Sequence, residues 1–196
     1  MQKNGSLKIA LIGAKTIGKT TIVSRMQYGK FSGSSLCTIG VSFSKLKYND
    51  IEYEIWDTAG QERFFALMPM YLRNARILLF VCDVSDAKSL NMIDLYIDML
   101  KNLDDYRIIV IGNKTDLLTE NEIENVADII KRKCGDSVLA DRIYDYIFVS
   151  AKTGANFDIF MDKLYQCAIE IRKIDPDHNQ TIKLDEEKIN RRLCSC

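Results

Sequence analysis

Short runs of apolar residues recur along the chain, separated by stretches in which apolar side chains return every three or four positions. The run from Leu7 to Ile12 ends at Gly13 and predicts a buried strand. Three later runs predict further buried strands at residues 77–84, 107–112 and 146–150. Continuous apolar runs of this kind are typical of strands that are covered on both faces.

A different pattern, strict alternation, appears between the first two of these runs. Residues 51–55 alternate apolar side chains with glutamates, as a strand with one buried face does. The turn Asn49-Asp50 joins them to an earlier extended stretch, Val41 to Tyr48, whose own alternation breaks after Phe43. The two stretches predict an antiparallel hairpin.

Helical spacing fills most of the segments between the strands. Residues 18–28 predict a helix after the first strand, and residues 132–145 lack any period and predict a surface loop. Three apolar stripes predict further helices: Leu90, Ile93, Ile97 and Leu100; Ile123, Val126 and Ile130; and Phe157, Phe160, Met161, Leu164, Ala168 and Ile171.

The order of these elements predicts an α/β fold: a six-stranded, mostly parallel sheet with one antiparallel edge hairpin and helices on both faces. In such a sheet the functional loops gather at the carboxyl ends of the strands. We expect a single domain over residues 7–174, a flexible N-terminus at 1–6 and a flexible, largely polar tail at 175–196.

Composition then excludes several classes of function. The 27 basic side chains balance the 27 acidic ones, so bulk charge gives no reason to expect nucleic-acid binding. The apolar runs are shorter than the ~20 residues of a membrane span, and no secretory signal is evident, so we expect a soluble chain. Of the six cysteines, Cys37, Cys82, Cys134 and Cys167 are scattered singly without disulfide or zinc spacing, which indicates a reducing compartment, and Cys194 and Cys196 form a separate pair at the end. His178 is the single histidine of the sequence, which argues against a serine–histidine triad.

The turn after the first strand carries the first chemical motif. Its sequence, Gly13-Ala14-Lys15-Thr16-Ile17-Gly18-Lys19-Thr20, matches the phosphate-binding pattern G-x-x-x-x-G-K-[ST]. Glycines let backbone N–H groups turn toward a polyanion, Lys19 would reach the terminal phosphates, and the Thr20 hydroxyl would bind magnesium. A chance match is the alternative, which the predicted strand before the motif and helix after it disfavour.

Three more motifs follow predicted strands. In Trp56-Asp57-Thr58-Ala59-Gly60-Gln61-Glu62, Asp57 could hold a magnesium water, the Gly60 N–H could meet a γ-phosphate, and Gln61 could orient an attacking water. In Asn113-Lys114-Thr115-Asp116, the Asp116 carboxylate could accept hydrogen bonds from guanine N1–H and N2, a donor pair that adenine lacks. In Ser150-Ala151-Lys152, the Ala151 N–H could meet the guanine carbonyl. Each motif alone also suits an ordinary polar turn.

Taken together and in this order, the four motifs resemble the Ras superfamily of small GTPases, which has the P-loop NTPase fold, over about residues 7–174. Thr38 to Phe43, Trp56 and Arg63-Phe64 resemble the Rab branch. Residues 71–75 do so imperfectly, because Leu72 and Asn74 stand where Rabs usually carry tyrosine and glycine.

The resemblance implies a GTPase that binds GTP or GDP with Mg²⁺ and hydrolyses GTP slowly without an activating protein. Gln61 would be the catalytic residue, Phe31 would stack on guanine, and Thr21 would join the phosphate loop. Thr20, Thr38 and Asp57 would hold the metal, Asp57 through water. The nucleotide-binding set implied is Gly13, Ala14, Lys15, Thr16, Ile17, Gly18, Lys19, Thr20, Thr21, Phe31, Thr38, Asp57, Gly60, Asn113, Lys114, Asp116, Ser150, Ala151 and Lys152.

A molecular switch in intracellular vesicle trafficking is the role that the resemblance implies. GTP would order both switch segments into an effector surface made of Ile39, Gly40, Val41, Phe43, Trp56, Phe64 and Tyr71, several of which core packing would also explain. The implied partners are an exchange factor, a GTPase-activating protein, a Rab escort protein or dissociation inhibitor, and effectors. We expect a monomer that binds no nucleic acid.

The chain ends in Cys194-Ser195-Cys196, which is similar to Rab endings in which both cysteines receive geranylgeranyl groups. Two lipid chains hold a protein stably on a bilayer, whereas one holds it only marginally. The expected location is the cytoplasmic face of an endomembrane or vesicle, with cycling through the cytosol. Free thiols or a fortuitous metal site are the alternatives.

Two features depart from the family. Small residues usually stand at the position of Lys15, so this lysine could block Gln61 and an incoming arginine finger, leaving a GTP-locked scaffold. Its ammonium could instead contact phosphate oxygens as an internal finger, or point to solvent. The stretch between Asp116 and Ser150 is longer than usual and carries Lys131-Arg132-Lys133, expected in a solvated loop. A nucleoside kinase is a further alternative, against which the guanine motif, Gln61 and the lack of an arginine-rich lid argue.

Overall fold

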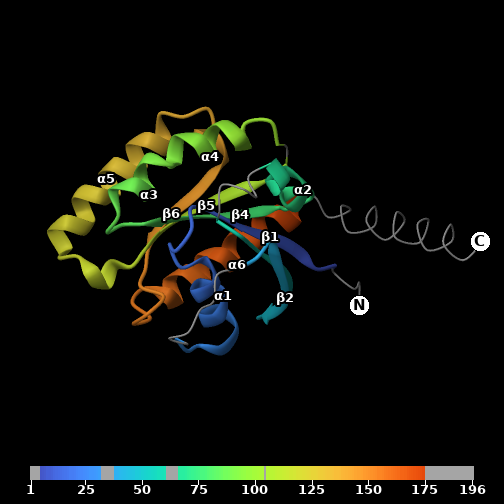
Figure 1. Cartoon of the computed structure of the whole chain (residues 1–196). Helices are drawn as coiled ribbons and strands as arrows, with labels where there is room; N and C mark the ends of the chain where they lie inside the picture. The colour runs from blue at the N-terminus through green and yellow to red at the C-terminus, as the bar shows by residue number, and fades with distance from the viewer. Residues whose placement is uncertain (1–4, 32–37, 61–65, 104, 175–196) are drawn as a thin grey trace, which may run out of the picture.

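Six strands form one sheet in the computed structural model, which describes residues 5–31, 38–60, 66–103 and 105–174 (Figure 1). The strands are β1 (Leu7–Ile12), β2 (Val41–Tyr48), β3 (Ile51–Thr58), β4 (Ile77–Asp83), β5 (Arg107–Asn113) and β6 (Ile143–Phe148). Their order is β2-β3-β1-β4-β5-β6. Only the edge pair β2–β3 is antiparallel, which confirms the predicted sheet.

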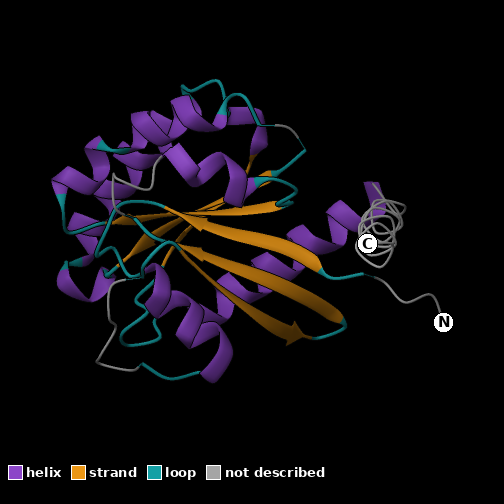
Figure 2. Ribbon diagram, turned by 45° about the vertical axis from the view of Figure 1, so that its right-hand side comes forward, coloured by secondary structure: helices purple, strands orange, loops and turns teal. Residues whose placement is uncertain are grey.

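Helices cover both faces of the sheet (Figure 2). They are α1 (Lys19–Tyr28), α2 (Met68–Leu72), α3 (Ala87–Asn91), α4 (Ile93–Leu100), α5 (Glu120–Gly135) and α6 (Phe157–Ile174), with short 3₁₀ turns at Thr115–Leu117 and Ala140–Arg142. Within the described ranges, no helix has the length and apolarity needed to cross a membrane.

The sheet separates two apolar cores, and β1 contributes side chains to both of them. Ile9 and Leu11 pack with α1 and α6 on one face, whereas Ala10 and Ile12 pack with α2, α4 and α5 on the other. Successive side chains of a strand point to opposite faces, so a central strand needs apolar residues at every position. This explains why the run from Leu7 to Ile12 is continuous rather than alternating.

Most predicted elements are confirmed. The first strand and the hairpin turn have the predicted bounds, and all six residues of the last apolar stripe are buried in α6. The stripe that begins at Leu90 is divided, however, because α3 ends at Asn91 and α4 starts at Ile93. The separate helix α3 has its own N-cap, the Asp86 side chain, which accepts a hydrogen bond from the Lys88 N–H.

The prediction of a surface loop over residues 132–145 is wrong at both ends. Helix α5 continues to Gly135 because Cys134 extends the buried stripe of Ala127 and Ile130. The basic cluster Lys131-Arg132-Lys133 is therefore helical, and the Lys133 Nζ lies 2.6 Å from Asp94 Oδ2 of α4. Strand β6 begins at Ile143 and ends at Phe148, not at 146–150.

The domain limits predicted at residues 6/7 and 174/175 remain predictions. Residues 1–4 and 175–196 lie outside the described residues, and α6 ends at Ile174. The predictions for His178, Cys194 and Cys196 therefore concern residues outside the described ranges.

Candidate nucleotide-binding site

The turn between β1 and α1 is tightly fitted against the neighbouring strands. Gly13 and Gly18 have φ angles of +136° and +96°, which residues that carry a side chain rarely adopt. A Cβ atom at Gly13 would lie 2.3 Å from the Val81 carbonyl oxygen, and one at Gly18 would lie 2.4 Å from Asn113 Nδ2. Both glycines are therefore required by the position of the loop beside the ends of β4 and β5.

Lys19 turns back into this loop. Its Nζ donates hydrogen bonds to the carbonyl oxygens of Gly13 and Ala14, each at 2.8 Å. Burial lowers the pKa of Lys19 to about 8, although the Asp57 carboxylate opposes that effect. The ammonium group thus lies on the loop's inner side, whereas the Lys15 side chain is exposed to solvent. Thr20 and Thr21 follow in the first turn of α1.

An oxygen cluster lies beside Lys19 and joins three segments of the chain. The Thr20 hydroxyl donates to Asp57 Oδ2 at 2.6 Å and lies 2.8 Å from the Thr38 hydroxyl, which is itself 3.3 Å from Asp57 Oδ2. The other carboxylate oxygen, Asp57 Oδ1, is buried and accepts no hydrogen bond from any described residue. Burial also raises the pKa of Asp57.

This cluster fits a magnesium ion. Mg²⁺ prefers oxygen ligands and is commonly bound by one or two carboxylates together with phosphates. A buried carboxylate oxygen without a donor is costly unless a cation or water occupies the space beside it. Within the described ranges, no group of three or more His, Cys, Asp or Glu side chains forms a metal site, so the fit rests on Asp57 and the two threonines.

Gly60 brings the end of β3 against the phosphate loop. A Cβ atom at this position would lie 2.4 Å from the Ala14 carbonyl oxygen and 2.4 Å from Lys19 Nζ. Only a glycine allows the two backbones to approach this closely. The residues that follow, Gln61, Glu62, Arg63 and Phe64, lie outside the described residues.

Asn113 connects the phosphate loop with the turn that follows β6, the last strand of the sheet. Its Nδ2 donates to the Ile17 carbonyl oxygen at 2.8 Å, and its Oδ1 accepts from the Ala151 N–H at 3.0 Å. The side chain is buried, so both bonds are sheltered from water. The Ala151 N–H, which the sequence assigns to guanine, is thus also within reach of Asn113.

Asp116 and Lys114 are held by partners from neighbouring segments. Ser150 Oγ donates to Asp116 Oδ1 at 2.5 Å, and Lys152 Nζ lies 3.8 Å from Asp116 Oδ2. Lys114 has a φ of +70° and its Nζ lies 2.5 Å from Asp83 Oδ2. The structure therefore brings the predicted motifs at 113–116 and 150–152 together beside the phosphate loop.

Two residues that contribute to this arrangement were missed by the sequence analysis. Asp83 holds Lys114, and Arg25 of α1 donates hydrogen bonds to the carbonyl oxygens of Ala151 and Lys152. The Arg25 contact spans 126 residues along the chain. No local pattern signals it, because the acceptors are backbone atoms, which any residue would supply.

The predicted effector residues form a partly exposed apolar surface. Ile39 is 80% exposed and Phe43 is 50% exposed, and the Phe43 ring meets Trp56 edge-on at 5.6 Å. Val41, Trp56 and Tyr71 are half-buried. Leu67 and Met70, which the sequence pattern does not single out, are also exposed. Phe31, the predicted partner of the guanine ring, is 44% exposed.

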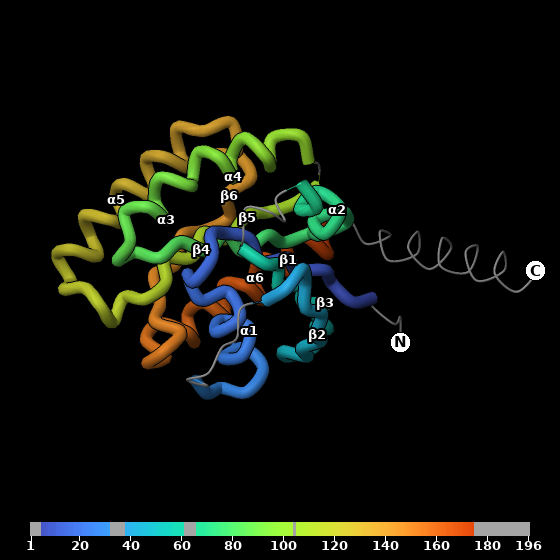
Figure 3. Tube along the Cα trace, viewed as in Figure 1, coloured from blue at the N-terminus to red at the C-terminus, as the bar shows by residue number. Residues whose placement is uncertain are grey.

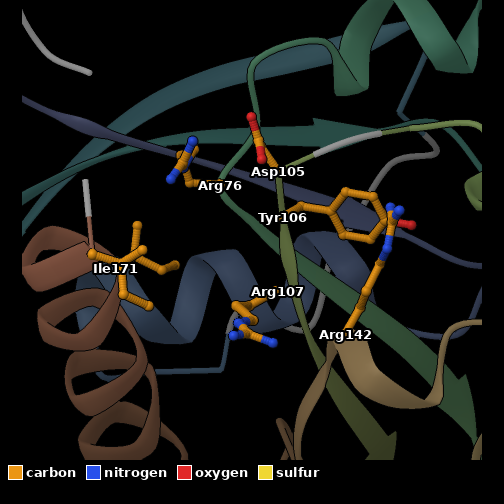
Figure 4. A pocket seen from close by; sticks show the side chains of 7 residues that line it. Arg76, Asp105, Tyr106, Arg107, Arg142 and Ile171 are labelled. Carbon is orange, nitrogen blue, oxygen red and sulfur yellow. The ribbon is translucent and has the colours of Figure 1, made fainter. Parts of the chain in front are cut away.

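A separate pocket at the opposite edge of the sheet is not built as an anion site. It lies at the amino ends of β4 and β5 and includes three arginines. In Figure 4 the guanidinium groups of Arg76, Arg107 and Arg142 point in different directions. Arg107 donates to the Asp141 carbonyl oxygen, and Arg142 lies 4.7 Å over the Tyr106 ring.

Comparisons with known proteins agree with the motifs. The model for the Ras family matches residues 8–170. The GTP-binding protein YPT53 of Saccharomyces cerevisiae is 34% identical over 194 residues, covering 94% of this chain and 87% of the yeast protein.

Proposed function

This chain belongs to the Ras family and is a Rab-type small GTPase, and from that premise we propose that it acts as a GTP/GDP switch in intracellular vesicle trafficking. The observation that carries the proposal is the oxygen cluster of Thr20, Thr38 and Asp57 beside the buried Lys19. It joins the phosphate loop to both segments that a switch would have to control.

In the proposed site the loop Gly13–Thr20, with Thr21, surrounds the phosphates, and Lys19 neutralises their charge. Thr20 and Thr38 would hold Mg²⁺ through their hydroxyls, and Asp57 would hold it through a water. When bound, the ion screens the charge that builds up on the phosphate oxygens during transfer. Phosphate oxygens would compete with the carbonyl oxygens of Gly13 and Ala14 for the hydrogen bonds that Lys19 Nζ now donates to them.

Guanine selection is assigned to the opposite end of the site. Asp116 would accept from guanine N1–H and N2, the Ala151 N–H would donate to the guanine carbonyl, and Phe31 would stack on the ring. Asn113, Lys114, Ser150 and Lys152 would hold these groups in place, which their hydrogen bonds and ion pairs support. A base that lacks this donor pair, such as adenine, would leave the Asp116 carboxylate without hydrogen-bond donors, which would make its binding costly.

The switch itself would consist of Thr38 and Gly60 binding the γ-phosphate. Thr38 supports this role because its hydroxyl already lies 3.3 Å from Asp57. Loss of the γ-phosphate would free the residues around Ile39, Gly40 and Phe43 on one side and Phe64 and Tyr71 on the other. Effectors that bind the apolar surface would then dissociate, and an exchange factor would reload the site.

Hydrolysis is assigned to Gln61, which would orient the attacking water. The test is single-turnover hydrolysis of preloaded GTP by the wild type, Gln61→Leu and Lys15→Gly. Because the Lys15 side chain is exposed, we expect the wild type to hydrolyse at a rate similar to that of Lys15→Gly, and only Gln61→Leu to stall.

The contrary result would favour a second function, a GTP-locked scaffold. In that case the wild type is as slow as Gln61→Leu, and Lys15→Gly restores the rate. A Rab-activating domain extends the comparison: an equal acceleration of the wild type and Lys15→Gly would exclude the scaffold.

Membrane attachment would come from geranylgeranyl groups on Cys194 and Cys196, delivered with the help of a Rab escort protein. The test is prenylation in vitro followed by flotation with liposomes, comparing the wild type with Cys194→Ser, Cys196→Ser and the double variant. Two lipid chains bind a bilayer stably and one binds it marginally, so we expect the wild type to float fully, each single variant weakly and the double variant not at all. Flotation of the double variant would contradict the proposal. A localisation on the cytoplasmic face of an endomembrane or vesicle rests on the same cysteines.

A further inference from the structure

We propose that Arg25 is a positioning residue of the guanine site, which fixes the backbone of residues 151–152 and thereby slows the release of guanine nucleotides. The inference rests on the proposed function, because it takes the Ala151 N–H as a donor to the guanine carbonyl. It adds a residue outside all four sequence motifs.

Arg25 contacts two segments, the loop that contains Ala151 and Lys152 and the end of its own helix at Gly29. Its Nε donates to the Ala151 carbonyl oxygen at 2.6 Å, and its Nη2 donates to the Lys152 carbonyl oxygen at 2.7 Å. Its Nη1 donates to the Gly29 carbonyl oxygen at 3.2 Å, just before Phe31 in the chain. Figure 3 shows the corresponding proximity: the loop before α6, in orange, lies beside α1, in blue.

The surroundings hold the guanidinium in this orientation. It lies 5.8 Å from the centre of the Phe157 ring, at the start of α6. A Cβ atom at Gly154, whose φ is +94°, would lie 2.9 Å from Arg25 Nη1, so the loop after Lys152 closes tightly over the side chain. Arginine's planar fork can reach several carbonyl oxygens at once, whereas a lysine ammonium on its flexible stem cannot reproduce that geometry.

The position of Arg25 on α1 connects its contacts with the phosphate loop. Lys19 and Arg25 belong to the same ten-residue helix, which begins at the phosphate loop. One rigid element therefore carries both the group that neutralises the phosphates and the group that holds the base loop. The distance between the phosphate and base subsites is fixed by α1 and not by the flexible connections of either loop.

The test compares release of ribose-labelled GDP, IDP and 6-thioguanosine diphosphate from the full chain with Mg²⁺ present. IDP keeps the carbonyl oxygen that Ala151 would contact, whereas the sulfur of 6-thioguanosine is a weaker acceptor. For Arg25→Ala, release of GDP and IDP should accelerate about tenfold, whereas release of the thio nucleotide should accelerate less than about twofold. Without the charged hydrogen bonds of Arg25, the Ala151 N–H is no longer held in position, and this loss matters most when the base offers a good acceptor. Arg25→Lys should resemble Arg25→Ala.

A matched control is Arg132→Ala, which removes an exposed arginine from α5 and should leave all three release rates unchanged. Thermal melting in saturating GDP reports any general loss of stability. Equal acceleration of all three nucleotides, or none, would show that Arg25 has only a structural role and would overturn the inference. If the wild type itself releases GDP and the thio nucleotide equally fast, the assignment of Ala151 under the proposed function fails, and the inference fails with it.

Discussion

At the scale of single residues, Lys19 and Asp57 stand out because both are ionisable, buried and close to one another. Burial lowers the pKa of Lys19 to about 8 and raises the pKa of Asp57. Each shift disfavours the charged form that phosphate and metal binding require. Phosphate favours the ammonium form of Lys19 and Mg²⁺ favours the carboxylate form of Asp57, so the binding of each ligand should reverse the corresponding pKa shift.

The lowered pKa of Lys19 can be tested directly. In protein labelled with ¹³C at the lysine ε-carbon, we expect one resonance to titrate near pH 8, assigned by its loss in Lys19→Arg. GDP should shift that titration upward, because phosphate charge favours the ammonium form. Since nucleotide prefers protonated Lys19, GDP affinity should fall as the pH rises above about 8. A titration that GDP leaves unmoved would contradict the assignment of Lys19 to the phosphates.

The residues that the sequence could reveal are those whose chemistry is local. Gly13, Gly18 and Lys19 occupy a fixed spacing in a strand–turn–helix context, so the pattern alone locates them. Arg25 and Asp83 gain their roles only when distant segments meet. A helix surface that carries an arginine looks the same in sequence whether the side chain is solvated or clamps a loop.

At the scale of elements, α5 shows how a helix start can be well specified. The Thr119 side chain accepts from the Glu122 N–H, and the Glu122 carboxylate accepts from the Thr119 N–H at 2.8 Å. This reciprocal capping box satisfies two backbone donors that would otherwise lack partners. The hydrogen bonds that the Thr119 N–H and hydroxyl donate to the Glu122 carboxylate lower the pKa of Glu122.

Removing this cap should weaken the domain without affecting the site. Thr119→Ala should lower the free energy of unfolding by about 1 kcal/mol, which corresponds to a fall of about 2–4 °C in melting temperature. The release rate of GDP should stay unchanged, because α5 begins outside the nucleotide loops. Calorimetry and nucleotide release measure the two effects, and an unchanged melting temperature would mean that the cap contributes nothing.

The elements predicted best are those with apolar residues at every core position. β1 has such a run and was predicted to its last residue, whereas β6 was misplaced because most of its side chains are only half-buried and its pairing with β5 shifts register at Ile108/Ile109. The sequence pattern does not predict the end of α5, because the basic run Lys131-Arg132-Lys133 separates Cys134 from the rest of the buried stripe. The break between α3 and α4 depends on a cap at Asp86 that competes with a continuous helix.

At the scale of the whole molecule, the strand order decides where the site lies. β1 sits between β3 and β4, and the chain leaves β1 for α1 on one face of the sheet but leaves β3 and β4 for α2 and α3 on the other. Loops after such a reversal in strand order diverge and leave a crevice at the carboxyl edge of the sheet. The phosphate loop, Asp57, Asn113 and Ala151 reach that crevice from four different strands or their ends.

Core stability and ligand binding should therefore be separable. Phe160 is fully buried and meets Phe157 edge-on at 5.3 Å, so Phe160→Ala should cost about 3–5 kcal/mol of unfolding free energy. The additional stabilisation by saturating GDP should equal that of the wild type, because it depends only on ligand concentration and affinity. Asp116→Ala should show the reverse, with a small loss of basal stability and a smaller GDP effect. Chemical unfolding with and without GDP distinguishes the two patterns.

The bond from Arg25 to Ala151 also bears on how the protein is made. During translation, the phosphate loop and α1 leave the ribosome early, but the carbonyl oxygens that Arg25 holds are encoded 126 residues later. A nascent chain therefore lacks the base-binding part of the site until β6 has paired with β5 and the loop after β6 has emerged. Capture of GDP or GTP by a growing polypeptide should consequently begin only after the loop that contains Ala151 has emerged, so that nucleotide binding marks a completed site.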